Sequence, residues 1–273
     1  MVKKIGLISG MGELPFAIAE EAKEKGFRIF AIALEPLADR RLSEYVDDIR
    51  WINVGKLGEM IKALKRFGIK EAVMAGKVPK SLLYKSRIMP DLRAAKLLFS
   101  LKDRRDDSIL LAITHELEKE GISLLKTTEF CSTLLAPRGV LTKNRPTDEE
   151  LNDIAFGWKI AKELGRLDIG QTVVIKNKAV MALEAIEGTD EAIRRGGRYA
   201  HKGAVVVKVS KPDQDMRFDV PAAGLATLEV MIEVKARVLA VEAGKTILLQ
   251  KDDLLNQAQA AGISVVGYRN DID

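Results

Sequence analysis

The N-terminal part of the chain alternates between short apolar segments and longer amphipathic segments, and this alternation restricts the fold more than any other feature. Short apolar segments are typical of buried strands, and apolar residues at helical spacing that stop at Gly26 and Gly68 are typical of helices. The predicted strands are Lys4–Ser9, Arg28–Ala33, Ile49–Val54 and Glu71–Ala75, and the predicted helices are Phe16–Lys25 and Leu57–Phe67. Strands joined through helices imply right-handed crossovers and a parallel sheet, which binds ligands at the carboxyl ends of its strands.

The pattern changes near residue 145. A chain of 273 residues is long enough for about two domains. Pro146 and Thr147 predict the start of a helix that runs to Gly165. Beyond it the predicted strands are Gln171–Ile175, Val180–Ala185, Ala204–Val209, Val238–Val241 and Thr246–Leu249, with helices near Asp190–Arg195, Thr227–Lys235 and Asp252–Ala261. We therefore predict an α/β protein with a Rossmann-like parallel-sheet domain over residues 1–143 and an α+β domain over residues 144–273.

Composition excludes several classes of protein and site. A hydrophobic fraction of 47% with 30% charged residues is typical of a soluble globular protein, and no apolar run approaches the roughly 18 residues that cross a bilayer. We therefore expect a cytoplasmic protein. Cys131 is the only cysteine, and His115 and His201 are the only histidines. These counts exclude a thiolate metal cage and a histidine-rich dinuclear site, and they argue against a Ser-His-Asp triad.

The net charge of +5 and the isoelectric point near 9.1 suit an anionic substrate or an anionic membrane surface. Basic residues are interleaved with acidic ones along the chain, so we do not expect nucleic-acid binding.

Two glycine-containing loops follow predicted strands of the first domain. Gly10, Met11, Gly12 and Leu14 lie in or beside the first loop, and Gly76 and Lys77 follow the fourth strand. Two glycines allow backbone amides to approach a phosphate at the N-terminus of the next helix. The third glycine of a dinucleotide fingerprint is missing, because its position is occupied by Pro15. The pair of loops predicts a nucleotide pocket that is not a standard nicotinamide site.

A dense run of charge lies between a predicted strand and a predicted helix of the second domain. Lys208 and Lys211 are followed by Asp215, Arg217 and Asp219. Carboxylates of this kind bind a divalent cation, and the neighbouring cations bind phosphate oxygens. A solvated hairpin is the alternative interpretation of the same run.

Two further segments carry candidate residues. Asp107 lies in a cluster of charges that precedes an apolar helix, where capping of that helix explains at least one of the acids. Glu187, Thr189 and Asp190 occupy a predicted strand end, a glycine turn and a helix start. Capping alone explains Thr189 or Asp190, and Glu187 is the less ordinary residue.

Six of these segments together resemble one known family. They are Ile5–Pro15, Ala75–Val78, Arg105–Leu110, Glu187–Ile193, Lys211–Pro221 and Ala240–Gly244. Their order and spacing are similar to those of the LpxI-type UDP-2,3-diacylglucosamine pyrophosphatases, and the resemblance spans nearly the whole chain. The Lys-Pro-x-Gln-Asp-x-Arg-Phe-Asp-x-Pro run and the Glu-Gly-Thr-Asp turn are its most specific parts.

The resemblance implies a two-domain, Mg²⁺-dependent hydrolase of lipid A biosynthesis. Such an enzyme cleaves UDP-2,3-diacylglucosamine to UMP and 2,3-diacylglucosamine 1-phosphate. Its amphiphilic substrate implies transient contact with the inner face of the membrane, and a homodimer is a reasonable expectation for an enzyme of this size.

The resemblance also implies roles for individual residues. Asp219 is the critical carboxylate, either a Mg²⁺ ligand or a base that orients water. The remaining catalytic residues are Asp215, Arg217, Lys208 and Lys211, and the remaining metal ligands are Asp215, Glu187 and Asp190. The substrate-binding residues are Gly10, Met11, Gly12, Leu14, Gly76, Lys77, Asp107 and Thr189.

Two other functions fit parts of the sequence. A nicotinamide-dependent oxidoreductase explains the first-domain sheet and an acidic residue after the second strand, which Glu35 supplies, but it requires the missing glycine. A non-catalytic nucleotide-binding or regulatory protein explains the same sheet and makes the run around Asp219 a structural turn.

Overall fold

The computed structural model describes residues 3–79, 89–101, 106–212 and 214–270, without the side chains of Asp106 and Asp107. The chain forms two compact units. Unit 1 comprises Met1–Ser132 and Asp215–Phe218, and unit 2 comprises Thr133–Gln214 and Asp219–Asp273. The sequence prediction placed the domain boundary at residues 143/144. In the structure, segment Asp215–Phe218 of the charged run belongs to unit 1, although the chain on both sides of it belongs to unit 2.

Unit 1 is built on a parallel sheet, as the alternating pattern predicted. Its strands run in the order β3-β2-β1-β4-β5, and every pairing is parallel. The bounds are β1 Lys3–Ser9, β2 Phe27–Glu35, β3 Asp48–Asn53, β4 Glu71–Ala75 and β5 Ser123–Leu124. The helices are α1 Leu14–Glu24, α2 Leu57–Arg66, α3 Leu92–Ser100 and α4 Asp106–Lys119, with short 3-10 helices at Arg40–Glu44 and Thr127–Phe130.

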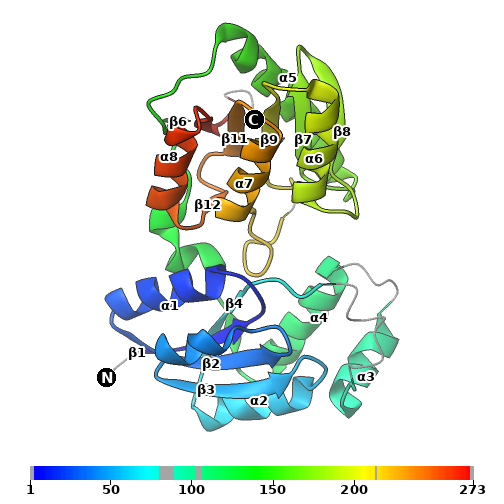
Figure 1. The fold of residues 1–273 in the computed structure, drawn as a ribbon. Helices are drawn as coiled ribbons and strands as arrows, with labels where there is room; N and C mark the ends of the chain where they lie inside the picture. Colours follow the sequence, from blue (N-terminus) through cyan, green and yellow to red (C-terminus); the bar gives the residue numbers. More distant parts are fainter. Residues whose placement is uncertain (1–2, 80–88, 102–105, 213, 271–273) are drawn as a thin grey trace. The chain divides into compact units, whose positions relative to one another are not determined.

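Helices cover both faces of this sheet (Figure 1). On one face, α2, α3 and α4 contribute Leu64, Leu97 and Leu117 to a buried cluster that also contains Ile8 and Ile32 of the strands. On the other face, α1 packs against β1, β2 and β4. The loops that leave the carboxyl ends of the strands therefore lie along one edge of a sheet that is rigid on both faces.

Unit 2 contains a mixed sheet with the order β6-β13-β11-β9-β7-β8. Its central strands β9, β11 and β13 are parallel, and β6, β7 and β8 pair antiparallel at the two sides. The bounds are β6 Gly139–Val140, β7 Thr172–Lys176, β8 Ala179–Leu183, β9 Val205–Lys208, β11 Val238–Glu242 and β13 Ser264–Tyr268. A separate two-stranded sheet joins β10 Ala222–Ala223 and β12 Ile247–Leu248. The helices are α5 Asp148–Arg166, α6 Thr189–Ala200, α7 Leu225–Glu233 and α8 Lys251–Ala260.

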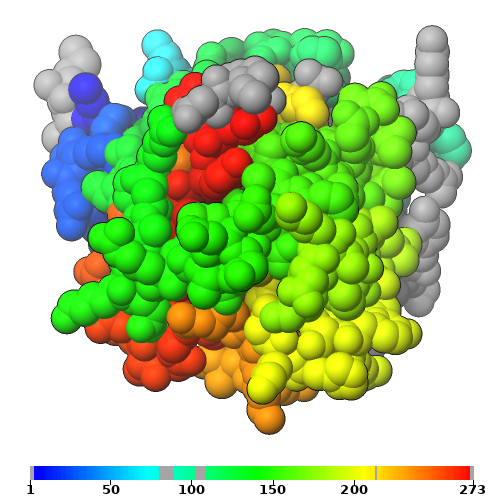
Figure 2. All heavy atoms as spheres, turned by 90° about the horizontal axis from the view of Figure 1, so that it is seen from above, coloured from blue at the N-terminus to red at the C-terminus, as the bar shows by residue number. Residues whose placement is uncertain are grey.

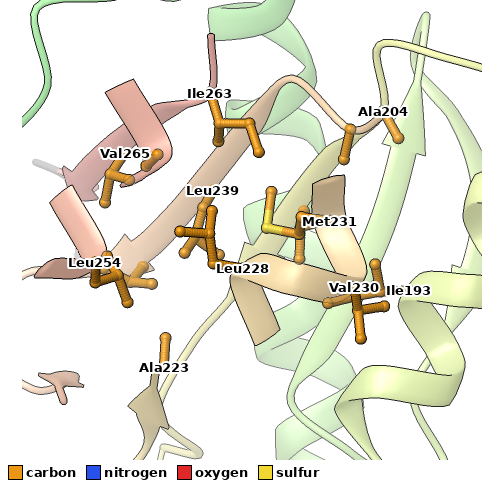
Figure 3. Packing of buried hydrophobic residues seen from close by; sticks show 14 of the residues in the cluster. Ile193, Ala204, Ala223, Leu228, Val230, Met231, Leu239, Leu254, Ile263 and Val265 are labelled. Atoms are coloured by element: carbon orange, nitrogen blue, oxygen red, sulfur yellow. The ribbon is translucent and has the colours of Figure 1, made fainter. Parts of the chain in front are cut away.

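Two buried clusters hold helices on the two faces of this sheet. Ile193 of α6, Met231 of α7 and Leu254 of α8 lie in one cluster with Leu239 of β11 (Figure 3). The α5 residue Trp158 belongs to the other cluster. In the space-filling view, the green segment that includes α5 extends across the middle of the surface (Figure 2). α5 starts at a capping box between Thr147 and Glu150, close to the helix start that the sequence predicted.

The alternation of side chains along β9 decides where Lys208 points. Val205 and Val207 belong to the cluster under α5, whereas Val206 belongs to the cluster under α6, α7 and α8. Successive side chains of a strand point to opposite faces, so Lys208 lies on the same face as Val206. This face carries the N-terminus of α6, where Thr189 lies.

No helix in the part of the chain that the structure describes combines the length and the apolar character needed to cross a membrane.

Candidate functional site

The glycine loops of unit 1 lie side by side at the carboxyl edge of the sheet. The backbone N–H of Gly10 donates to the carbonyl oxygen of Ala75 over 2.8 Å. Met11 and Lys77 exchange two backbone hydrogen bonds of 3.0 and 2.8 Å. The structure thus brings together the loops after β1 and β4, which the sequence predicted to share an edge.

Gly10 and Gly76 allow this close approach. A Cβ atom on Gly10 would lie 2.6 Å from the Lys77 carbonyl oxygen, and one on Gly76 would lie 2.7 Å from the Met11 carbonyl oxygen. Gly76 also has a φ of +87°, which L side chains adopt only with strain. These two glycines therefore serve contact between the loops, a purpose that the sequence interpretation did not anticipate.

The outward parts of the same loops remain accessible. Met11, Gly12 and Lys77 are exposed, and no atom lies within 4 Å of the position that a Cβ on Gly12 would take. α1 begins directly afterwards at the half-buried Leu14, and no side chain caps its N-terminus. A helix N-terminus beside an exposed lysine attracts anions, so this edge is suited to hold a phosphate group.

Segment Asp215–Phe218 is anchored to unit 1 by Thr127. The backbone N–H of Thr127 donates to the Met216 carbonyl oxygen over 3.0 Å. Its hydroxyl donates toward the carbonyl oxygens of Arg217 and Met74, both at 3.0 Å. Phe218 packs against the buried cluster under α2, α3 and α4. Met74 lies in β4 just before the Gly76 loop, so Thr127 connects that loop with the charged segment.

Asp215 and Arg217 form a two-pronged ion pair. The Arg217 Nε and Nη2 atoms donate to the Asp215 carboxylate over 3.0 and 2.7 Å, and Arg217 Nη1 lies 3.5 Å from Glu118 Oε1. The Arg217 guanidinium lowers the pKa of the Asp215 carboxyl below its ordinary value, and the Asp215 carboxylate raises the pKa of Arg217. Both groups are charged at neutral pH, and each already has the other as its hydrogen-bond partner.

In unit 2, Lys208 and Thr189 lie together in a buried chain of hydrogen bonds. The Lys208 ammonium donates to the Thr189 hydroxyl over 2.9 Å, and that hydroxyl donates to Glu184 Oε1 over 2.9 Å. Lys208 is only 6% exposed and Glu184 only 9%. A hydroxyl that links a buried ammonium to a buried carboxylate compensates part of the desolvation of both charges.

The other predicted unit 2 residues each have their own partner. Lys211 forms an ion pair with Asp168 at 2.6 Å, and Asp190 accepts a hydrogen bond of 3.1 Å from Thr227. Glu187 forms an ion pair with Arg195. Two hydrogen bonds lower the pKa of the Glu187 carboxyl. The larger effect comes from its own backbone N–H and the smaller one from Arg195.

Neither unit assembles a ready-made metal cage among its described residues. No group of three or more His, Cys, Asp or Glu side chains in the described ranges lies close enough to hold an ion. Asp219 is half-buried and is the first residue of unit 2 after segment Asp215–Phe218. The Asp107 side chain lies outside the described residues; its backbone lies in the first turn of α4.

A buried network at the carboxyl edge of β11 was not among the predicted site residues. Glu242 Oε2 accepts hydrogen bonds from the Lys162 ammonium at 2.6 Å and from the Ser210 backbone N–H at 2.8 Å. Gln214 Oε1 then accepts from the Ser210 hydroxyl and from the Lys211 backbone N–H. The network fixes the start of the charged run. The strand end and glycine turn at residues 242–244 are the sequence signal for it.

Comparison with solved structures gives weak likenesses. Phosphoribosylglycinamide synthetase from Anaerococcus prevotii matches 63% of this chain and 31% of its own at 13% identity, with a TM-score of 0.28. The biotin carboxylase subunit of pyruvate carboxylase matches 73% of this chain and 42% of its own at 14% identity, with a TM-score of 0.29.

Comparison of sequences gives a match along the whole chain. The UDP-2,3-diacylglucosamine pyrophosphatase LpxI of Caulobacter vibrioides is 33% identical over an alignment 277 positions long, which covers 97% of this chain and 98% of that protein. The model of the LpxI N-terminal domain matches residues 4–134, and the model of the LpxI C-terminal domain matches residues 137–266. The chain therefore belongs to the LpxI family.

Proposed function

We propose that this protein hydrolyses the pyrophosphate bond of UDP-2,3-diacylglucosamine in lipid A biosynthesis, releasing UMP and 2,3-diacylglucosamine 1-phosphate. One observation carries the proposal. A UDP-2,3-diacylglucosamine pyrophosphatase aligns with this chain over 97% of its length at 33% identity, through both of its domains.

The substrate presents two linked phosphates whose negative charge repels a nucleophile. Hydrolysis therefore needs cations on the phosphate oxygens and a carboxylate that orients water. The exposed Lys77 and the N-terminus of α1 are suited to the phosphates of the nucleotide. We assign phosphate contacts to Lys208, Lys211 and Arg217 as well, and substrate contacts to Thr189 and Asp107. In addition to this substrate contact, Thr189 accepts the hydrogen bond from the Lys208 ammonium.

We assign Asp219 as the catalytic carboxylate, because the motif that contains it matches the family pattern. Asp215 is its helper in this proposal. Since Asp215 already binds Arg217 through both carboxylate oxygens, a second role for Asp215 is to hold Arg217 in position.

Mg²⁺ is part of the proposal. The described residues of each unit contain no cluster of three acidic or histidine ligands, but Mg²⁺ is commonly held by one or two carboxylates together with substrate phosphates. Such a site fits Asp219. The other proposed ligands are Asp215, Glu187 and Asp190, which interact with Arg217, Arg195 and Thr227 in this structure. When bound, the ion neutralises charge on the pyrophosphate.

The substrate also defines where the enzyme works. We propose a cytoplasmic protein, active as a homodimer, that contacts the inner face of the membrane transiently to reach a diacylated substrate. The net charge of +5 supports contact with anionic lipids.

Product identity tests this proposal. Purified protein is incubated with UDP-2,3-diacylglucosamine in detergent micelles with Mg²⁺, and the products are separated by mass. UMP together with 2,3-diacylglucosamine 1-phosphate is the expected pair. Release of UDP means cleavage at the sugar carbon and overturns the proposal. Binding of UDP by a folded protein without any turnover favours a nucleotide-binding or regulatory protein instead.

A further inference from the structure

Helix α3 of unit 1 exposes large apolar side chains to solvent. Leu92 is 83% exposed and Phe99 is 91% exposed, and Met89, just before the helix, is 69% exposed. The opposite side of α3 is buried, because Ala94 and Leu97 belong to the cluster that packs on the sheet. A helix that is apolar on both sides is expected to contact a second apolar partner with its exposed side.

The exposed side chains share one face of the helix. Leu92 and Phe99 are seven residues apart, and the exposed Lys96 lies between them at helical spacing. The inner face of α3 packs against α2 and α4, whereas Leu92, Lys96 and Phe99 are exposed; Figure 1 shows the position of α3 in unit 1. We define Met89, Leu92, Lys96 and Phe99 as the α3 surface.

The sequence around α3 has a large excess of positive charge. Residues 77–105 contain nine Lys or Arg and two Asp, a net charge of +7, whereas the entire chain carries +5. Without this segment the chain would be slightly acidic. The α3 surface therefore lies in a strongly basic part of the sequence.

The charges of α3 that are held internally leave the outer face cationic. Asp91 accepts hydrogen bonds from the backbone N–H groups of Ala94 and Gly58, which fixes it at the helix N-terminus. Arg93 pairs with Glu116 at 2.6 Å and with Glu120 at 2.7 Å. Lys96 is exposed on the outer face beside Leu92 and Phe99. Apolar side chains that alternate with cations are typical of a helix that lies in an anionic membrane interface.

We infer that the α3 surface docks on an anionic phospholipid bilayer, with Leu92 and Phe99 inserted between the headgroups and Lys96 beside the lipid phosphates. This inference rests on the proposed function, because an enzyme for a diacylated substrate must meet that substrate at a bilayer. A second copy of the chain is disfavoured as the occupant. A two-fold symmetric contact through this surface would bring the Lys96 ammonium groups of two copies into one interface.

Sedimentation with vesicles tests the inference. Full-length protein is mixed with vesicles of phosphatidylcholine, with or without phosphatidylglycerol. We expect binding that requires phosphatidylglycerol and weakens with added salt. The double variant Leu92→Ser/Phe99→Ser should bind vesicles at least roughly tenfold more weakly, because two apolar side chains no longer enter the interface. Lys96→Glu should also weaken binding.

Ile186→Ser is the matched control, since Ile186 of unit 2 is 100% exposed and lies outside the α3 surface. This control should bind vesicles like the wild type. Equal binding by the wild type and the double variant overturns the inference, and so does a wild type that ignores anionic vesicles. A double variant that changes oligomeric state in analytical ultracentrifugation, with vesicle binding unchanged, also overturns it and identifies a subunit interface.

Micelle hydrolysis separates this inference from the proposed function. The double variant should cleave micellar substrate at the wild-type rate, because the detergent removes the need for bilayer docking. A wild type that binds vesicles but does not cleave the substrate sinks the proposed function alone.

Discussion

Thr127 shows how a single buried residue organises two parts of the proposed site. It is 1% exposed, and its backbone and hydroxyl together bind the carbonyl oxygens of Met216, Arg217 and Met74. No sequence pattern identified it, because its partners lie 53 to 90 residues away and Thr127 lies in no motif. Asp215 and Arg217, in contrast, were identifiable from the charged run itself.

Thr127→Val should lower the kcat of UMP release about tenfold or more, with a smaller effect on KM. Valine has nearly the shape of threonine but leaves the Met74 and Arg217 carbonyl groups without the hydroxyl, so segment Asp215–Phe218 loses its position. Thr127→Ser keeps the hydroxyl and should restore most of the activity. Steady-state kinetics on variants that are folded by circular dichroism decide the matter; wild-type kcat in Thr127→Val would show that the contact is only structural.

Asp215 should stabilise the protein in a pH-dependent way. Its folded-state pKa is below the ordinary value of 3.8 because Arg217 donates hydrogen bonds to the carboxylate. A lowered pKa in the folded state contributes stability that is fully present above the unfolded-state pKa and is lost as the pH falls through the folded-state pKa.

Asp215→Asn should therefore lower the free energy of unfolding by about 1 kcal/mol at neutral pH and by much less in strong acid. Urea unfolding of both proteins across this pH range measures the difference. A loss of the same size at every pH would mean that the ion pair with Arg217 does not stabilise the fold.

At the scale of elements, the loops after β1 and β4 form one paired structure. Their backbones pair directly, and the glycines are placed where a side chain would clash. The sequence predicted that the loops share an edge, because parallel strands place their carboxyl ends together. It did not predict that Gly10 and Gly76 serve this pairing, because the distance between two loops is a tertiary property.

Gly76→Ala should destabilise unit 1 and weaken UDP binding. The new methyl group would meet the Met11 carbonyl oxygen at 2.7 Å, in addition to the strain of a φ of +87°. Gly121→Ala is the matched control, since Gly121 has a φ of +76° with no atom within 4 Å of its Cβ position. We expect Gly76→Ala to lose about 1 kcal/mol more than Gly121→Ala in urea unfolding. Titration calorimetry should detect weaker UDP binding only in Gly76→Ala; equal behaviour of the two variants would refute the role of the loop pairing.

Most strands and helices were predictable to within a few residues, because each carries its own periodicity. Glu71–Ala75 was predicted with both ends as observed, and α5 begins next to the predicted Thr147 start. β13, in contrast, was not predicted. Its segment Ser264–Tyr268 is short and contains Gly267, and it is defined by parallel pairing with β11 rather than by local pattern. The two-residue strands β5, β6 and β10 are likewise products of tertiary pairing, whereas β12 lies within the predicted strand Thr246–Leu249.

At the scale of the whole molecule, the charged run of residues 208–219 is divided between the two compact units. Asp215 and Arg217 belong to unit 1, and Lys208, Lys211 and Asp219 belong to unit 2. The sequence predicted one continuous cluster at a strand-to-helix junction. Local spacing reveals which residues are close along the chain, but the division depends on Phe218 and Thr127, whose contacts join distant parts of the sequence.

The family assignment rests on features spread over the whole chain. Both LpxI domains match, so the proposed reaction is assigned to the two domains together. Asp219 is the residue on which that proposal depends most, because the motif that contains it matches the family pattern.

The most direct test is UMP release from UDP-2,3-diacylglucosamine, with and without Mg²⁺, by the wild type, Asp219→Ala and the control Asp253→Ala. Asp253 is an exposed aspartate of α8 in unit 2. We predict that removal of Mg²⁺ or of the Asp219 carboxylate lowers the rate by roughly a hundredfold or more, while a folded Asp253→Ala retains wild-type activity. Turnover by a folded Asp219→Ala at the wild-type rate, or a wild-type rate that is unchanged when Mg²⁺ is removed, would contradict this account.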